Sequence, residues 1–125
     1  MKSKEILLTI FSVVVIFGIV MILPKGNSGP ADLGEEMDTF AKCLNDAGAE
    51  MYGIYWCTAC KAQKDDFGAS FQYINYIECS EEADLCQEKD IEYTPTWILA
   101  DGYKLVGRQS LETLADQTGC TLPAN

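Results

Sequence analysis

The feature that most constrains this chain is an uncharged apolar run of 18 residues near its N-terminus. The run extends from Ile6 to Leu23 and reads ILLTIFSVVVIFGIVMIL. A helix of this length rises about 27 Å, close to the roughly 30 Å of a bilayer's hydrocarbon core. Lys2 and Lys4 precede the run, and basic flanks stay in the cytoplasm. The sequence therefore predicts a single-pass anchor over residues 1–23, with a cytoplasmic N-terminus and an extracytoplasmic remainder.

A cleaved signal peptide is the alternative interpretation of the same segment, because it also combines a basic start with an apolar middle. Two features favour the anchor. The run is longer than the usual apolar region of a signal peptide, and no small-residue cleavage motif follows it. Residues 24–30 (PKGNSGP) have the composition of a short linker that spans at most roughly 25 Å. Both interpretations place residues 31–125 outside the cytoplasm, as one small domain.

The exported part is acidic and rich in cysteine. Residues 31–125 hold six basic and eighteen acidic residues, a net charge of −12, which excludes a nucleic-acid partner because phosphates require a basic face. All six cysteines lie here, and an even number in an oxidising compartment predicts disulfides. The chain has no histidine, so thiols are its most reactive groups.

Hydrophobic periodicity predicts an α/β domain with a mixed sheet and helices on both faces. Apolar residues recur at helical spacing over 33–47, with Gly48 as the stop and Asp32 as a capping residue. Strands are expected at 51–56, 71–78, 96–99 and 103–106, the last two joined by an Asp-Gly hairpin. Further helices are expected from Cys57 to about Phe67, over 83–89, and over 110–118 before Gly119.

Cys57 and Cys60 form a CxxC pair (CTAC) where a buried strand is expected to lead into a helix. Free amides and the dipole at a helix N-terminus favour the thiolate, which is the nucleophile of disulfide exchange. In this interpretation Cys57 attacks a disulfide and Cys60 resolves the mixed disulfide. Zinc or copper binding is the alternative, but zinc needs four ligands and the chain lacks a second CxxC pair and any histidine. We therefore expect no metal and no cofactor.

The residues around this pair resemble the thioredoxin superfamily. Trp56 precedes the CTAC motif, and Thr94-Pro95 precedes another predicted strand. The resemblance implies that Pro95 is cis and packs opposite the cysteines, and that Thr94 pairs its backbone with a bound substrate. An X-Pro bond is the plausible cis site, because its cis penalty is small. We expect Trp56 at the rim of the substrate groove.

A closer resemblance covers nearly the whole exported domain. It is to the thioredoxin-like domain fused to bacterial vitamin K epoxide reductase homologues, through the segments FAKCL (40–44), MYGIYWC (51–57), KAQK (61–64), YIEC (76–79), YTPTWI (93–98) and QSLETLA (109–115). It implies disulfide donation to exported proteins, with a separate quinone-linked membrane oxidoreductase as partner. Thr58-Ala59 stands where that family is expected to have Pro-His. Met51 replaces the buried aspartate of cytoplasmic thioredoxins, and Glu50 is expected on the other face of the strand.

The remaining four cysteines permit three disulfide pairings. Cys79 is expected to end a strand and Cys86 to lie in the adjoining helix, so a Cys79–Cys86 bridge closes easily. A Cys43–Cys120 bridge then joins the first helix to the C-terminal end. We expect both bridges to be structural. A relay role for Cys79–Cys86, passing electrons to or from Cys57–Cys60, is the alternative.

Several functions fit this sequence. The leading hypothesis is a membrane-tethered thiol–disulfide oxidoreductase that acts on exported protein thiols as a disulfide donor or electron link. A tethered reductant, of the kind that serves cytochrome c maturation, reverses the electron flow. A thioredoxin-fold binding module with purely structural cysteines and a metallochaperone are the further alternatives.

Overall fold

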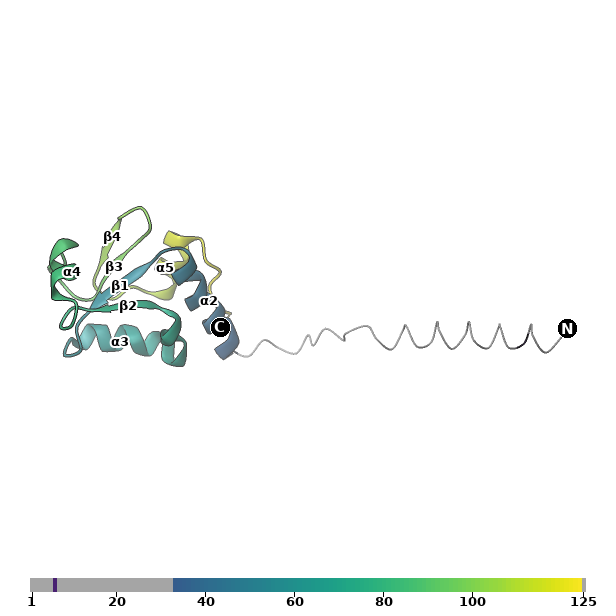
Figure 1. Ribbon diagram of the computed structural model, residues 1–125. Helices are drawn as coiled ribbons and strands as arrows, with labels where there is room; N and C mark the ends of the chain where they lie inside the picture. The colour runs from purple at the N-terminus through teal and green to yellow at the C-terminus, as the bar shows by residue number, and fades with distance from the viewer. Residues whose placement is uncertain (1–5, 7–32, 125) are drawn as a thin grey trace. The chain divides into compact units, whose positions relative to one another are not determined.

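Helices and strands alternate along the part of the chain that the computed structural model describes, residues 6 and 33–124 (Figure 1). The elements are α2 (Leu33–Asp46), β1 (Glu50–Gly53), α3 (Thr58–Phe67), the 3₁₀ helix η1 (Gly68–Tyr73), β2 (Asn75–Glu78), α4 (Ala83–Glu88), β3 (Thr96–Ile98), β4 (Lys104–Val106) and α5 (Leu111–Thr118). The predicted order of helices and strands is confirmed, with η1 as an addition. Residues of Ala31–Asn125 form one compact unit.

The four strands of this unit form one mixed sheet in the order β2-β1-β3-β4. β1 and β2 are parallel, and their register pairs Met51 with Tyr76 and Gly53 with Glu78. β3 runs antiparallel to β1 and to β4. Because α3 connects two parallel neighbours, the chain crosses one face of the sheet between β1 and β2. This arrangement is a thioredoxin-like α/β fold.

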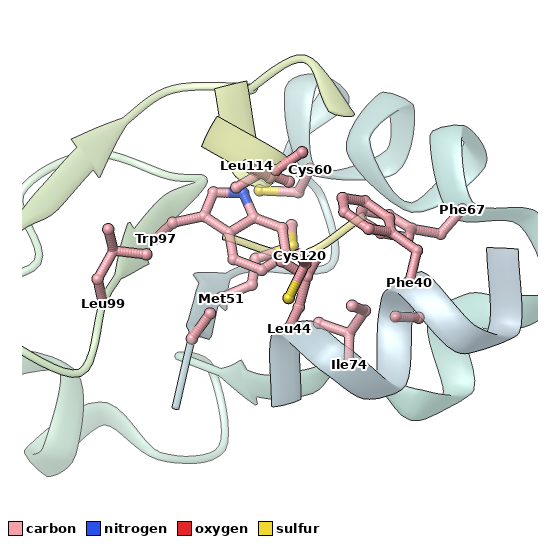
Figure 2. Close-up of a cluster of buried hydrophobic side chains, with 13 residues drawn as sticks. Phe40, Leu44, Met51, Cys60, Phe67, Ile74, Trp97, Leu99, Leu114 and Cys120 are labelled. Atoms are coloured by element: carbon pink, nitrogen blue, oxygen red, sulfur yellow. The ribbon is translucent and has the colours of Figure 1, made fainter. Parts of the chain in front are cut away.

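Side chains of the two sheet faces belong to two separate hydrophobic clusters. The larger cluster combines residues of α2, α3 and α5 with Met51 of β1 and Trp97 of β3 (Figure 2). The smaller cluster contains Tyr52 of β1, Ile98 of β3 and Cys86 of α4. Met51 and Tyr52 are neighbours in β1, so their side chains point to opposite faces. The expectation of helices on both faces is therefore confirmed, with α4 covering one face alone.

Local sequence explains where the helices begin and end. Phe40 and Leu44 are one turn apart in α2 and both are buried, as the periodicity predicts. The Ser110 hydroxyl caps α5 by accepting a hydrogen bond from the Thr113 amide at 3.1 Å. Gly119 ends α5 with a left-handed φ of 76°, which a glycine adopts without steric cost.

The predicted strand over 51–56 is wrong at its C-terminal half. β1 ends at Gly53, and the amide of Cys57 donates to the Ile54 carbonyl at 3.1 Å, which closes a turn. Tyr55 and Trp56 lie in this turn and are 67% and 62% exposed. The run is apolar in composition, but the turn that positions Cys57 takes its aromatic residues out of the sheet.

The predicted strand over 71–78 is wrong at its N-terminal half. β2 starts at Asn75, and the preceding residues form η1. Gly68 ends α3 with a φ of 54°, and the Ser70 hydroxyl, on a buried residue, donates to Asp38 of α2 at 2.6 Å. Phe71 packs against Phe67 of α3. The alternating pattern of residues 71–74 therefore reflects the packing of the 3₁₀ helix η1 against α2 and α3.

The structure forms both predicted bridges, Cys43–Cys120 and Cys79–Cys86. Of the predicted anchor and linker, only Ile6 is among the described residues, and Asp32 also lies outside them. None of the helices in the described part combines the length and hydropathy that a membrane span requires.

Candidate active site

Cys57 occupies the N-cap of α3, immediately after the turn that follows β1. Its Sγ accepts a hydrogen bond from the Cys60 amide at 3.1 Å. Cys57 and Cys60 are joined as a disulfide, with their Cα atoms 5.2 Å apart. An N-cap sulfur receives the unpaired amides and the positive end of the helix dipole, so the reduced Cys57 is stabilised as a thiolate.

The two cysteines of the pair differ in exposure. Cys57 is partly exposed, whereas Cys60 has 0% exposure and belongs to the larger core cluster. Figure 2 shows Cys60 at the Trp97 and Leu114 side of that cluster. A protein substrate can therefore reach the sulfur of Cys57 and not that of Cys60. Of the two sulfurs, that of Cys57 is therefore the accessible one.

The loop before β3 brings Thr94 and Pro95 to the same place. The Thr94–Pro95 peptide bond is cis, as predicted. The carbonyl oxygen of Thr94 lies 3.4 Å from the Cys57 Sγ, and the side chain of Pro95 is fully buried. Thr94 is partly exposed, so its backbone is accessible next to the reactive sulfur. The structure thus assembles Cys57, Cys60, Thr94 and Pro95, which are far apart in sequence.

Three exposed aromatic residues are sequence neighbours of the site residues: Tyr55 and Trp56 precede Cys57, and Tyr93 precedes Thr94. The rings of Tyr55 and Trp56 meet edge to face with their centroids 4.5 Å apart. Tyr93, next to Thr94, is 67% exposed. Trp56 was predicted at the rim of a groove, and it is an exposed residue adjoining Cys57. Exposed aromatic rings beside a reactive sulfur provide apolar contact area for a polypeptide.

Sequence reasoning missed a hydrogen-bonded pair near Cys60, formed by Tyr76 and Glu78. The Tyr76 hydroxyl donates to Glu78 Oε2 at 2.6 Å, and both residues belong to β2. Glu78 also accepts from the Tyr55 amide at 3.1 Å and from the Ser80 hydroxyl at 2.7 Å. The signal was a Tyr-x-Glu pattern at the end of a strand, whose two side chains share a face.

Burial and hydrogen bonding shift the pKa values of both Tyr76 and Glu78. Burial and the hydrogen bond to Glu78 raise the pKa of Tyr76 above its ordinary value. Burial alone would raise the pKa of Glu78 as well, but hydrogen bonds from Tyr76, Ser80 and Tyr55 outweigh it and lower this pKa. Near neutral pH the pair is therefore a protonated phenol that donates to an ionised carboxylate.

Strand β1 brings no carboxylate to Cys60, because residue 51 is a methionine and the Glu50 side chain lies on the other face of the sheet. Met51 has 0% exposure in the same cluster as Cys60. Glu50 accepts a hydrogen bond from Tyr52 at 2.8 Å, and Tyr52 belongs to the smaller cluster across the sheet. The expectation that Glu50 points to the other face is therefore correct.

The Cys79–Cys86 bridge lies apart from the Cys57–Cys60 pair. Cys79 and Cys86 lie in or against the smaller cluster, across the sheet from Cys60, which favours a structural role for their bridge. In the part of the chain that the structure describes, no group of three or more His, Cys, Asp or Glu side chains could hold a metal ion.

The chain is similar in sequence to a curated oxidoreductase. No family model matches the chain. It is 40% identical over 91 residues to the thiol-disulfide oxidoreductase LTO1 of Arabidopsis thaliana, which covers 66% of this chain and 24% of LTO1. The chain thus spans about a quarter of the length of this curated relative.

Among solved structures, the chain resembles the oxidised form of mitochondrial thioredoxin 3 of Saccharomyces cerevisiae. The TM-score is 0.44 and the identity 19%, over 57% of this chain and 74% of that one. The fold assignment rests instead on the order and directions of the strands and on the helices that cover both faces of the sheet. Residues 33–124 thus have a thioredoxin-like fold, and the chain is similar in sequence to a thiol–disulfide oxidoreductase.

Proposed function

We propose that this chain is a thiol–disulfide oxidoreductase whose redox group is the Cys57–Cys60 pair. The observation that carries the proposal is the position of the Cys57 sulfur, partly exposed at a helix N-cap and 3.4 Å from the carbonyl oxygen of Thr94. Its partner sulfur on Cys60 is fully buried. The Cys57 sulfur can thus react with a substrate, and the buried Cys60 sulfur can then complete the exchange within the protein.

The exchange conserves atoms and electrons whether the pair oxidises or reduces its substrate. When the pair acts as an oxidant, a substrate thiolate attacks Cys57 Sγ, the Cys57–Cys60 bond breaks, and Cys60 leaves as a thiolate. A second substrate thiolate then attacks the substrate sulfur of the mixed disulfide and releases Cys57. The substrate loses two electrons and the pair gains them. Reduction of a substrate follows the same steps in reverse.

The proposal extends to the setting of this reaction. The apolar run that starts at Ile6 anchors the chain, and the domain acts outside the cytoplasm on exported protein thiols. A quinone-linked membrane oxidoreductase, similar to vitamin K epoxide reductase, reoxidises Cys57–Cys60. Support for this setting comes from the uncharged run and from the sequence resemblance, whereas the similarity to LTO1, of which the chain covers 24%, supports the exchange reaction alone.

Serine variants of the two cysteines test the chemistry. Cys57→Ser should abolish exchange with a reduced model peptide, since the accessible sulfur is lost. Reduced Cys60→Ser, mixed with the same peptide in its disulfide form, should trap a mixed disulfide, because the Cys57 thiolate attacks the peptide disulfide and the resolving sulfur is lost. Mass spectrometry under non-reducing conditions detects that adduct. If both variants fold and exchange as the wild type does, the cysteines are structural and the chain is a binding module.

The reduction potential of the full chain decides the direction of electron flow. It is measured by equilibrating Cys57–Cys60 against glutathione buffers in mild detergent. A potential near about −120 to −180 mV is that of oxidants and isomerases and supports the donor role. A potential near about −270 mV or below is that of thioredoxin and replaces the donor role with a tethered reductant.

A further inference from the structure

The burial of Cys60 raises the question of how its proton moves. Its sulfur alternates between disulfide and thiol in every exchange cycle, so a proton must reach it or leave it each time. Cys60 has 0% exposure and lies among apolar side chains. An isolated thiolate is unfavourable there, because burial disfavours the charged form. A polar group near Cys60 is needed to exchange this proton with solvent.

Gly53 shows which group is close enough. A Cβ added at Gly53 would lie 3.0 Å from the Tyr76 hydroxyl oxygen and 3.3 Å from the Cys60 Sγ. The same Cβ would lie 2.8 Å from Tyr76 Cε2, so the Tyr76 ring packs directly on Gly53, and its hydroxyl and the Cys60 sulfur both lie within 3.3 Å of one point. One bridging water molecule or a small shift of the phenol connects two atoms this close to each other.

Tyr76 continues this path towards the surface. Its hydroxyl donates to Glu78 at 2.6 Å, and Glu78 is partly exposed and accepts from the exposed Ser80. The charged groups that face the pair are Lys64 of α3, whose Nζ lies 3.9 Å from the Tyr76 ring centroid, and the acidic Glu81 after β2. Glu81 and Glu82 border the same surface hollow as Glu78.

We propose that Tyr76 and Glu78 carry the proton between the buried Cys60 sulfur and solvent, in place of the buried aspartate that cytoplasmic thioredoxins have where Met51 stands here. This inference rests on the proposed function and names two further residues of the same site. Tyr76 passes the proton as a relay, and Glu78 is its acceptor and donor on the solvent side.

The step can be followed atom by atom during reduction of a substrate disulfide. The Cys57 thiolate attacks the substrate, which forms a mixed disulfide and releases one substrate thiolate. Cys60 then gives its proton to the Tyr76 oxygen while the Tyr76 hydroxyl proton moves to the Glu78 carboxylate. The Cys60 thiolate attacks Cys57 Sγ, closes the protein disulfide and releases the second substrate thiolate. The substrate gains the two electrons, and Glu78 releases the proton to solvent.

The chain contains a matched control pair. Tyr52 donates to Glu50 at 2.8 Å, with the same two residue types and the same spacing in the adjoining strand. Burial and the bond to Glu50 also raise the pKa of Tyr52. Tyr52 belongs to the smaller cluster on the opposite face from Cys60. Its variants reproduce the structural cost of losing a Tyr–Glu bond without touching a path to the sulfur.

The test uses the full reduced chain in mild detergent and an aromatic disulfide that releases a coloured nitrothiobenzoate. The first release reports attack by Cys57, and the second reports closure by Cys60. Stopped-flow absorbance resolves the two phases over a range of pH. The variants are Tyr76→Phe and Glu78→Gln, with Tyr52→Phe and Glu50→Gln as controls. Tyr76→Phe keeps the ring contacts with Phe71 and Lys64, so the fold is retained.

We expect Tyr76→Phe and Glu78→Gln to slow the second phase by about a hundredfold at neutral pH, the size of a general acid–base contribution. The first phase should stay unchanged in both. At alkaline pH the second phase should recover, because hydroxide removes the Cys60 proton directly. Tyr52→Phe and Glu50→Gln should leave both phases as in the wild type.

Three other outcomes count against the inference. An unchanged second phase in both site variants overturns it and leaves the proposed function intact. A slow second phase that does not recover at alkaline pH shows a structural role and also overturns it. If the wild type releases no colour at all, the proposed function itself fails and the inference falls with it.

Discussion

At the residue scale, one buried amide fixes the helix that carries the redox pair. Gln63 lies one turn after Cys60 in α3 and has 0% exposure. Its oxygen accepts from Trp97 Nε1 at 3.1 Å and from the Gln109 amide at 2.7 Å, and its nitrogen donates to the Gln109 carbonyl at 3.0 Å. These bonds connect α3 to β3 and to the loop before α5, so they hold Cys60 at a fixed depth in the core.

Replacing Gln63 with leucine should destabilise the domain strongly. The change leaves the Trp97 indole and the Gln109 amide without an acceptor, and each buried unsatisfied group costs about 1–3 kcal/mol. Urea denaturation followed by tryptophan fluorescence measures the loss. Gln72→Leu is the control, because Gln72 is exposed and makes one hydrogen bond, to the Ala69 carbonyl. Equal midpoints for the two variants would contradict this role for Gln63.

At the element scale, helices were easier to predict than strands. The bounds of α3 and α5 follow from local signals, a capping residue at Cys57 or Ser110 and a glycine after the last turn. Strand bounds depend on partners that are distant in sequence. β1 ends at Gly53 because the next residues form a turn, a choice that the apolar composition of 51–56 does not reveal.

The same distinction holds for the candidate site. Cys57 and Cys60 are recognisable from a four-residue motif, and Pro95 from a family resemblance. Tyr76 and Glu78 become part of the site only through the register of β2 on β1, which pairs them with Met51 and Gly53. That register is a long-range property, so the local Tyr-x-Glu pattern predicts that the two side chains share a face but not that they lie near Cys60.

The two structural bridges should differ in their contribution to stability. Cys43–Cys120 closes a separation of 77 residues and Cys79–Cys86 one of 7. The chain-entropy model gives about 4 kcal/mol for the long bridge and about 2 kcal/mol for the short one. Double alanine variants of each pair, compared by urea denaturation with Cys57–Cys60 intact, measure the two values. A short bridge that contributes as much as the long one would show that loop entropy does not govern their effect.

At the scale of the whole molecule, a strongly acidic domain follows an apolar N-terminal run. Residues 31–125 have a net charge of −12, and a net charge far from zero makes domains repel one another in solution. The run that starts at Ile6 has no charge over its 18 residues. We propose that this run, which has the length of a bilayer span, anchors the protein in a membrane.

We expect the full chain to remain in the membrane fraction after an alkaline carbonate wash, with its N-terminal residues intact by mass spectrometry. Each lysine placed mid-span costs roughly 2.5–3.5 kcal/mol of insertion free energy. Val14→Lys combined with Val15→Lys should therefore release the chain, whereas Val14→Leu should not. A wild-type product that is soluble and shortened near residue 25 would identify a cleaved signal peptide instead.

The place where the chain enters the domain adjoins the place where it leaves. The Ala124 amide donates to Glu36, in the first turns of α2, at 2.8 Å. Cys57 lies beyond the carboxyl end of β1, whereas α2 leads into its amino end. The two ends of residues 33–124 therefore lie at the same corner of the domain, so a segment joined to either end would start from that corner.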